Sequence, residues 1–244
     1  MTEPEQQTGG KIAALGRTAL ALVIGTVLDA LRLWRIAIWI PLLVVLPELF
    51  QHGVEINLGM FDSRAAFKAL SADPQRMLFG YLKVAGLVLA IIAAAGYWSR
   101  RGGHKVRWAA AGIALLLNVI PFVLLLPIEG HVSEPVWMVI NVAVSIAAFP
   151  LLVLLLGALF GDQAMTLSNA YRNGWGKAVR IALLVPLGWL PLSPIHQYNH
   201  FLAMGQPQGI IWALMVWDST IVGLMACWAG TALHHGYRGV FAKR

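Results

Sequence analysis

Two ionisable side chains lie inside long apolar segments, where an unpaired charge is costly. Lys83 lies in the segment that begins near Met77, and Asp218 lies in the segment that begins near Gly209. Charged residues within membrane-spanning segments commonly line an ion pathway or form a buried pair. Both lie roughly six to ten residues from the same predicted end of their segments, so a pair between them is one prediction. The alternatives are that the Lys83 stem carries its ammonium to the interface and that Asp218 caps or kinks its helix.

Histidines form a second group of candidate residues. His196 and His200 are four residues apart, so a helix would place both imidazoles on one face. Such a pair can bind a metal ion when a carboxylate joins it, and His131 is a third candidate ligand on the same predicted side. The alternative is that these histidines are interfacial residues without a ligand role. The sequence as a whole therefore predicts no cofactor. If a metal ion is bound, His196, His200 and His131 are its candidate ligands.

Other polar residues within apolar segments point to structure more than to chemistry. Asn118 and Asn141 are typical of the amides that form hydrogen bonds between membrane helices. The chain holds no G-x-S-x-G, H-E-x-x-H, Walker A or G-x-G-x-x-G pattern. No catalytic residue is therefore predicted, although intramembrane catalysis by dispersed residues stays open.

The composition indicates what must position these residues. Of 244 residues, 59% are hydrophobic and 12% are charged, against about 45–50% and 25% in soluble domains. A membrane crossing takes about 20 helical residues, so this length supplies about six spans. Cys227 is the only cysteine, which excludes an intramolecular disulfide and any two-cysteine metal site.

The resulting prediction is an all-α polytopic membrane protein, a bundle of six transmembrane helices with an N-terminal interfacial amphipathic helix. The domains are a disordered tail (1–10), a cytoplasmic interfacial helix (11–32), a six-span membrane domain (33–233) and a basic cytoplasmic tail (234–244). The interfacial helix is expected because its polar residues fall within one arc. One straight span from 20 to 50 is the alternative, but it would measure about 46 Å.

The orientation of the chain in the membrane follows from the distribution of Lys and Arg. With both termini inside, the cytoplasmic side carries fourteen of these residues and the outer side four, which agrees with the positive-inside rule. We therefore expect a multi-pass protein of the bacterial inner membrane with cytoplasmic termini. One inner loop is expected to contact anionic headgroups through Arg100, Arg101, Lys105 and Arg107. The net charge of +7 is scattered at the ends of apolar runs, so nucleic acid is not a predicted partner.

Two stretches resemble a bacterial six-span membrane domain that is associated with glycerophosphodiester phosphodiesterases. They are Val27–Arg35 (VLDALRLWR) and Ala164–Lys177 (AMTLSNAYRNGWGK). The sequence holds no counterpart of that family's soluble phosphodiesterase barrel, so no hydrolytic residue is carried over. The resemblance implies a helical membrane module.

Three functions are compatible with this sequence, and a non-catalytic role is favoured over an enzyme because no catalytic motif is present. The first is a non-catalytic membrane protein that organises lipid or a membrane protein complex, with a membrane protein partner or a second copy of the chain. The second is a small transporter or channel that uses Lys83 and Asp218, and the third is a lipid-modifying enzyme. A scaffold predicts a filled bundle, a transporter predicts a polar path through the bundle, and an enzyme predicts convergent polar groups that open to one leaflet.

Overall fold

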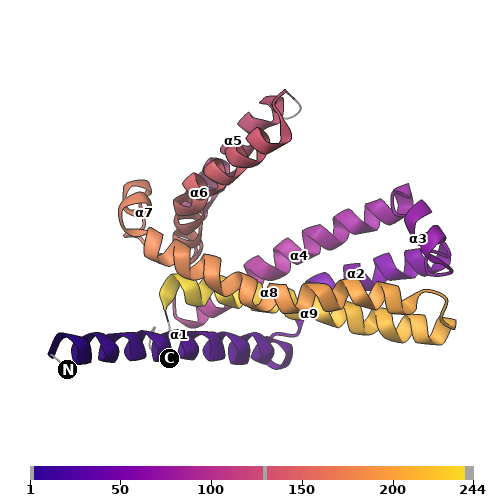
Figure 1. Ribbon diagram of the computed structural model, residues 1–244, viewed down its shortest axis with the longest axis horizontal. Coiled ribbons are helices and arrows are strands. Elements are labelled where there is room, and N and C mark those ends of the chain that lie inside the picture. Colours follow the sequence, from indigo (N-terminus) through magenta and orange to yellow (C-terminus); the bar gives the residue numbers. More distant parts are fainter. Residues whose placement is uncertain (1–2, 129–130, 240–244) are drawn as a thin grey trace. The chain divides into compact units, whose positions relative to one another are not determined.

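The computed structural model describes residues 3–128 and 131–239, with the side chains of Ala14 and of residue 16 onward in the first helix. Within these ranges the chain forms helices and turns and no strand. The prediction of an all-α fold is confirmed. The α-helices, labelled in Figure 1, are α1 (Glu3–Ile36), α2 (Trp39–Asn57), α3 (Arg64–Ala69), α4 (Pro74–Arg101), α5 (Trp108–Leu125), α6 (Glu134–Leu159), α7 (Leu167–Asn173), α8 (Trp175–Ala203) and α9 (Gln208–Arg238). The short 3₁₀ helix η1 (Leu126–Ile128) follows α5.

Most of these helices are long and apolar enough to cross a membrane. Five qualify alone, namely α4, α5 with η1, α6, α8 and α9. A sixth arises if α1 and α2 count as one broken span, because Gly16–Ile36 and Trp39–Asn57 qualify together and meet at an angle of 80°. By length and composition, the chain is therefore a multi-pass membrane protein.

The N-terminal region differs from the predicted boundaries. Residues 3–10, predicted as a disordered tail, belong to α1, and that helix runs past residue 32 to Ile36. The bend lies at Ala37 and Ile38 instead, and fully buried Leu33 of α1 and Ile40 of α2 anchor its two sides. One straight helix from 20 to 50 is not formed. At the other terminus, α9 continues to Arg238, and residues 240–244 of the predicted tail lie outside the described ranges.

The chain forms two compact units. Unit 1 comprises residues 1–95 and 184–232, and unit 2 comprises residues 96–183 and 233–244. Three helices, α4, α8 and α9, contribute to both units because their lengths run across these boundaries.

The apolar core of unit 1 joins α2, α4 and α9. Val44, Ala90, Val222 and Ala226 form a buried cluster, and their small side chains let the helices approach closely. A Cβ at Gly86 would overlap the backbone carbonyl of Leu43, so glycine permits the contact between α4 and α2. A second buried cluster near α3 contains Phe61, Ala203, Ile211 and Met215.

Unit 2 contains the hairpin of α5 and α6, which lie side by side (Figure 1). The Asn118 amide donates to the Leu151 carbonyl of α6 at 2.8 Å and to the Ala114 carbonyl of its own helix at 2.7 Å. The Asn141 amide donates within α6, to the Trp137 carbonyl at 3.0 Å. Of the two predicted polar contacts, the one at Asn118 therefore joins two helices and the one at Asn141 stays within its helix.

Candidate metal centre in unit 1

One face of α2 carries four buried polar side chains. Residues three, four and seven apart share a helical face, and this spacing brings together Glu48, Gln51, His52 and Glu55. Carboxylates and imidazoles are rarely buried without partners. This face must therefore meet polar groups on other helices of unit 1.

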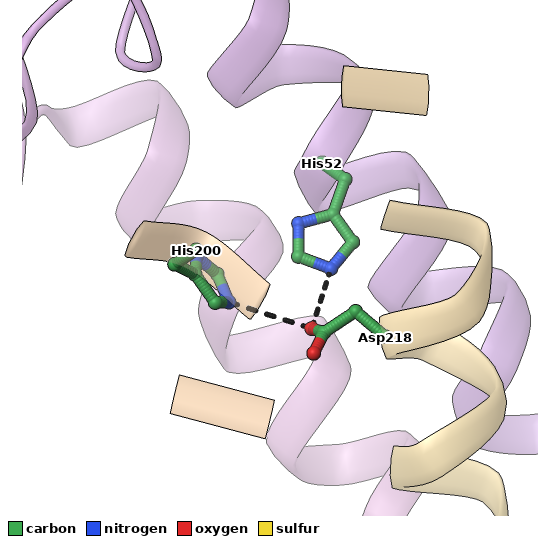
Figure 2. A group of neighbouring side chains, drawn as sticks. All are labelled: His52, His200 and Asp218. Atoms are coloured by element: carbon green, nitrogen blue, oxygen red, sulfur yellow. Dashed lines mark hydrogen bonds and ion pairs between the residues drawn. The ribbon is translucent and has the colours of Figure 1, made fainter. Parts of the chain in front are cut away.

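Asp218 on α9 is the point at which these helices meet. Its carboxylate is fully buried, and its Oδ2 atom lies 3.2 Å from His52 Nε2, 2.7 Å from His196 Nδ1 and 3.4 Å from His200 Nε2. Figure 2 shows His52 and His200 directed at this carboxylate from separate elements. The other carboxylate oxygen, Oδ1, accepts a hydrogen bond from the Asn199 amide at 2.9 Å.

The two α8 histidines reach the same atom because α8 is continuous from Trp175 to Ala203. Pro194 lies inside this helix, yet His196 and His200 keep the spacing that places them on one face. Their side chains are 22% and 12% exposed, whereas those of His52 and Asp218 are fully buried, so the α8 histidines are the partly exposed members of the group.

Two cations from α4 contact the carboxylates of α2. Lys83 Nζ lies 3.4 Å from Glu48 Oε1, and Arg76 Nε donates to Glu55 Oε1 at 2.9 Å. The predicted pair between Lys83 and Asp218 is not formed: in the described part of unit 1, Lys83 pairs with Glu48 while Asp218 meets the histidines. The prediction is based on similar depth in the membrane, and depth does not determine in which direction a side chain points around its helix axis.

The fixed charges of this cluster do not balance. Three carboxylates, from Glu48, Glu55 and Asp218, face two fixed cations, Arg76 and Lys83. The difference, three minus two, is one negative charge in a poorly hydrated place, where an uncompensated charge is costly. A proton on one imidazole or a bound cation must supply the missing positive charge.

The contacts of the two His52 ring nitrogens also indicate that a positive charge is required. Its Nδ1 lies 2.9 Å from Glu55 Oε2, while its Nε2 lies 3.3 Å from Glu48 Oε1 and 3.2 Å from Asp218 Oδ2. A neutral imidazole has one N–H and one lone pair. One of its two nitrogens would therefore direct its lone pair at a carboxylate oxygen, and the two would repel each other. An imidazolium or a cation beside Nε2 removes this conflict. A histidine that donates through Nδ1 to a carboxylate and offers Nε2 is the usual arrangement of a metal ligand.

The spacing of the donor atoms fits a metal ion. In a tetrahedral zinc site with bonds of about 2.0–2.1 Å, neighbouring ligand atoms are about 3.3 Å apart. The distances of Asp218 Oδ2 from His52 and His200, 3.2 and 3.4 Å, match this value. Two overlapping groups have all ligand atoms within 4.8 Å of one another: His52, His200 and Asp218, and Glu48, His196 and Asp218.

Unsatisfied atoms occur in the same place. Four buried atoms of this cluster have no hydrogen-bond partner among the described residues: Glu48 Oε2, Gln51 Oε1, His196 Nδ1 and His200 Nδ1. The 2.7 Å approach of His196 Nδ1 to Asp218 thus lacks hydrogen-bond geometry. Buried polar atoms are almost always satisfied, so the unpartnered atoms around Asp218 point to a group bound at this place.

The remaining predicted residues lie elsewhere. His131 belongs to unit 2, as do Asn118 and Asn141. So do the predicted headgroup contacts Arg100, Arg101, Lys105 and Arg107. Sequence reasoning placed His52 on the same predicted side as His196 and His200 but did not make it a ligand, and it missed Glu48 and Glu55 as site residues. The spacing of Glu48, His52 and Glu55 on one face of the first span was a readable signal.

Comparisons with known proteins add no relative. No protein-family model matches the chain, and no curated protein and no solved structure matches it. The resemblance to the six-span membrane domain therefore stays a prediction.

Proposed function

We propose that this multi-pass membrane protein is a metal-dependent hydrolase whose unit 1 binds one divalent transition-metal ion. The observation that carries the proposal is the convergence of His52 and His200 on the Asp218 carboxylate at 3.2 and 3.4 Å, the spacing of metal ligands. Nitrogen and carboxylate oxygen donors together suit zinc and its neighbours in the first transition row. A bound ion also supplies the positive charge that the cluster lacks.

Individual residues have distinct roles in this proposal. His52, His200 and Asp218 hold the ion, and Glu55 orients His52 through its Nδ1 atom. An ion held there would supply Lewis-acid chemistry, lowering the pKa of a water molecule and polarising the bond to be cleaved. Glu48 Oε2, which has no hydrogen-bond partner among the described residues, would act as the general base that accepts a proton from the attacking water.

The packing below the centre favours an enzyme over a transporter. Deeper in unit 1, the same helices meet through Val44, Ala90, Val222 and Ala226, which are buried and apolar. A transport path would need polar groups or water at this level. Convergent polar groups near one end of the helices, above an apolar core, support the enzyme alternative. A lipid-organising scaffold needs no such buried charge.

The orientation of the centre follows from the distribution of Lys and Arg. We propose a bacterial inner-membrane location with cytoplasmic termini, because this threading places fourteen of the 18 Lys and Arg residues on the cytoplasmic side. His196 and His200 lie near the end of α8, and Asp218 lies in the first half of α9. This threading directs the centre to the outer leaflet, where lipid is the substrate class within reach.

An apolar groove of about 530 Å³ lies apart from this centre. It is lined by Phe50, Val54 and Asn57 of α2 together with residues of α4 and α9. These α2 positions lie on the helical face opposite His52. The groove therefore does not lead to the metal ligands, and we assign the entry route to the side of the partly exposed His196 and His200.

Metal analysis of the purified full chain tests the binding step. We expect about one equivalent of a divalent transition metal per chain after reconstitution, and loss of that metal in His52→Gln and Asp218→Asn. His131→Gln, a histidine change in unit 2, is the matched control and keeps its metal. A wild-type chain that stays metal-free in the presence of excess zinc, manganese and iron would refute the proposal.

A second measurement separates catalysis from structural metal binding. Hydrolysis in H₂¹⁸O places one ¹⁸O atom in the product whatever the ester is, so the reconstituted protein is incubated with a membrane lipid extract in this solvent. We expect metal-dependent labelling that falls by about 10²-fold or more in Glu48→Gln, the size expected for general-base removal. A Glu48→Gln protein with full metal and full labelling would disprove the role of Glu48, and a metal-loaded wild type without labelling would disprove hydrolysis of lipid.

A further inference from the structure

A second concentration of charge lies in unit 2 and takes no part in the metal centre. It surrounds the turn after α6, where helix ends of α5, α8 and α9 also meet. Four cations contribute to it: Arg107, Lys177, Arg180 and Arg238. Only Arg107 belongs to the set that the sequence predicted for headgroup contact.

The cations greatly outnumber the carboxylates here. Asp162 is the carboxylate of this cluster, and Lys177 Nζ lies 3.8 Å from its Oδ2 atom. Glu134, another acidic residue of unit 2, begins α6 and is therefore at the opposite end of that helix. Four positive charges against one negative charge leave an excess of three among the described residues.

Backbone carbonyls fix the arginines without neutralising them. Arg107 Nη1 donates to the Asp162 carbonyl at 2.7 Å, Arg180 Nε donates to the Gly236 carbonyl at 2.9 Å, and Arg238 Nη2 donates to the Phe160 carbonyl at 2.6 Å. A guanidinium has five N–H donors, so further donors remain on each. Arg238 Nε is buried and has no hydrogen-bond partner among the described residues. The arginines are therefore held in place with unused donors and unbalanced charge.

One aromatic ring holds two of the cations together. Tyr237 is buried, and its hydroxyl donates to Asp162 Oδ2 at 2.7 Å. Lys177 Nζ lies 3.7 Å from the centre of the Tyr237 ring, and the Arg238 guanidinium lies 5.7 Å from it. Two like charges gathered around one ring repel each other, and an anionic ligand would relieve that repulsion.

The level of the cluster in the membrane indicates the ligand. Trp108 and Trp175, which begin α5 and α8 at this end, are 75% and 40% exposed. Exposed tryptophans at helix ends are typical of the headgroup layer. We infer that this end of unit 2 binds the phosphate group of an anionic phospholipid through Lys177, Arg180 and Arg238. Inorganic phosphate offers the same chemistry from solution and is the competing source.

Lipid binding by the full chain in detergent tests this inference. Native mass spectrometry counts the phosphatidylglycerol molecules retained by wild type, Lys177→Gln, Arg180→Gln and the double variant. We expect apparent affinity to fall about five-fold for each cation removed, and roughly 25-fold in the double variant. Arg172→Gln removes an exposed cation of α7 outside the cluster, and it should bind as wild type does.

The controls decide between a site and diffuse attraction. Equal losses in Arg172→Gln and Lys177→Gln would overturn the site, as would wild-type binding in a double variant whose melting temperature without lipid is unchanged. Arg180→Gln alone serves if the double variant does not fold, because Arg180 is exposed. Titration with inorganic phosphate is the second arm: stabilisation by phosphate without retention of phosphatidylglycerol would refute the lipid as the source.

Discussion

The ion pair between Lys83 and Glu48 permits a sharp test of the charge balance in unit 1. The two atoms are 3.4 Å apart, the Glu48 side chain is fully buried, and the Lys83 side chain is 23% exposed. Without metal, the cluster carries three carboxylates and two fixed cations. The net charge of these five groups is therefore −1. Lys83→Met changes this net charge to −2, whereas Glu48→Gln changes it to zero. The two single variants should therefore differ in stability.

The size of the effect follows from the distance. At 3.4 Å and an effective dielectric constant of about 20, the pair attracts by about 5 kcal/mol before desolvation. Breaking a buried pair by removing one partner costs about 3–5 kcal/mol. Because Lys83 is partly exposed, we expect Lys83→Met to lower the free energy of unfolding by about 3 kcal/mol. Glu48→Gln should cost about 1 kcal/mol or less, since it also removes the unbalanced charge.

The double variant supplies the decisive comparison. Lys83→Met with Glu48→Gln restores the original charge sum, so it should be more stable than Lys83→Met alone, with a coupling energy of about 1–3 kcal/mol. Denaturant unfolding of the metal-free protein in detergent, with EDTA present, measures all four free energies. Lys68→Met combined with Glu48→Gln is the control cycle, because Lys68 lies exposed on α3. Additivity within about 0.5 kcal/mol in the Lys83 cycle, or a Glu48→Gln variant as unstable as Lys83→Met, would refute this charge accounting.

Two further predictions concern threading and pH. A cysteine at His104 should resist an impermeant thiol reagent in intact cells and one at Gln206 should react, because the basic loop is expected inside; the reverse pattern would invert the threading. Partial burial opposes the ionisation of Asp162, but the Tyr237 hydrogen bond and the Lys177 charge outweigh it and hold the Asp162 pKa below its ordinary value. The ionised carboxylate thus stabilises unit 2 above about pH 4, and this contribution is lost as pH falls through the lower folded-state pKa. The difference in melting temperature between wild type and Asp162→Asn should accordingly shrink below about pH 4, and a constant difference would contradict the assignment.

The amino-acid sequence by itself determined the class of fold. Apolar runs of about 20 residues can satisfy their backbone groups in a membrane only as helices, whose hydrogen bonds are internal to each run. Composition and run length therefore sufficed for an all-α, multi-pass protein. The polar face of α2 is also determined by local sequence, because the spacing of Glu48, His52 and Glu55 can be read from the chain. This spacing was not interpreted as part of a site.

What surrounds each polar group was decided by the tertiary structure. Sequence position gave Lys83 and Asp218 similar depths, but their partners depend on how each helix is rotated about its axis, and neighbouring side chains set that rotation. His52 and Asp218 are 166 residues apart and meet at 3.2 Å; no periodicity within one segment carries such a contact. The bend at Ala37 and Ile38 has the same origin, because buried contacts on both sides of the corner fix its place. A buried charge finds its partner among the side chains that packing brings within reach, and that choice exists only once the helices have assembled.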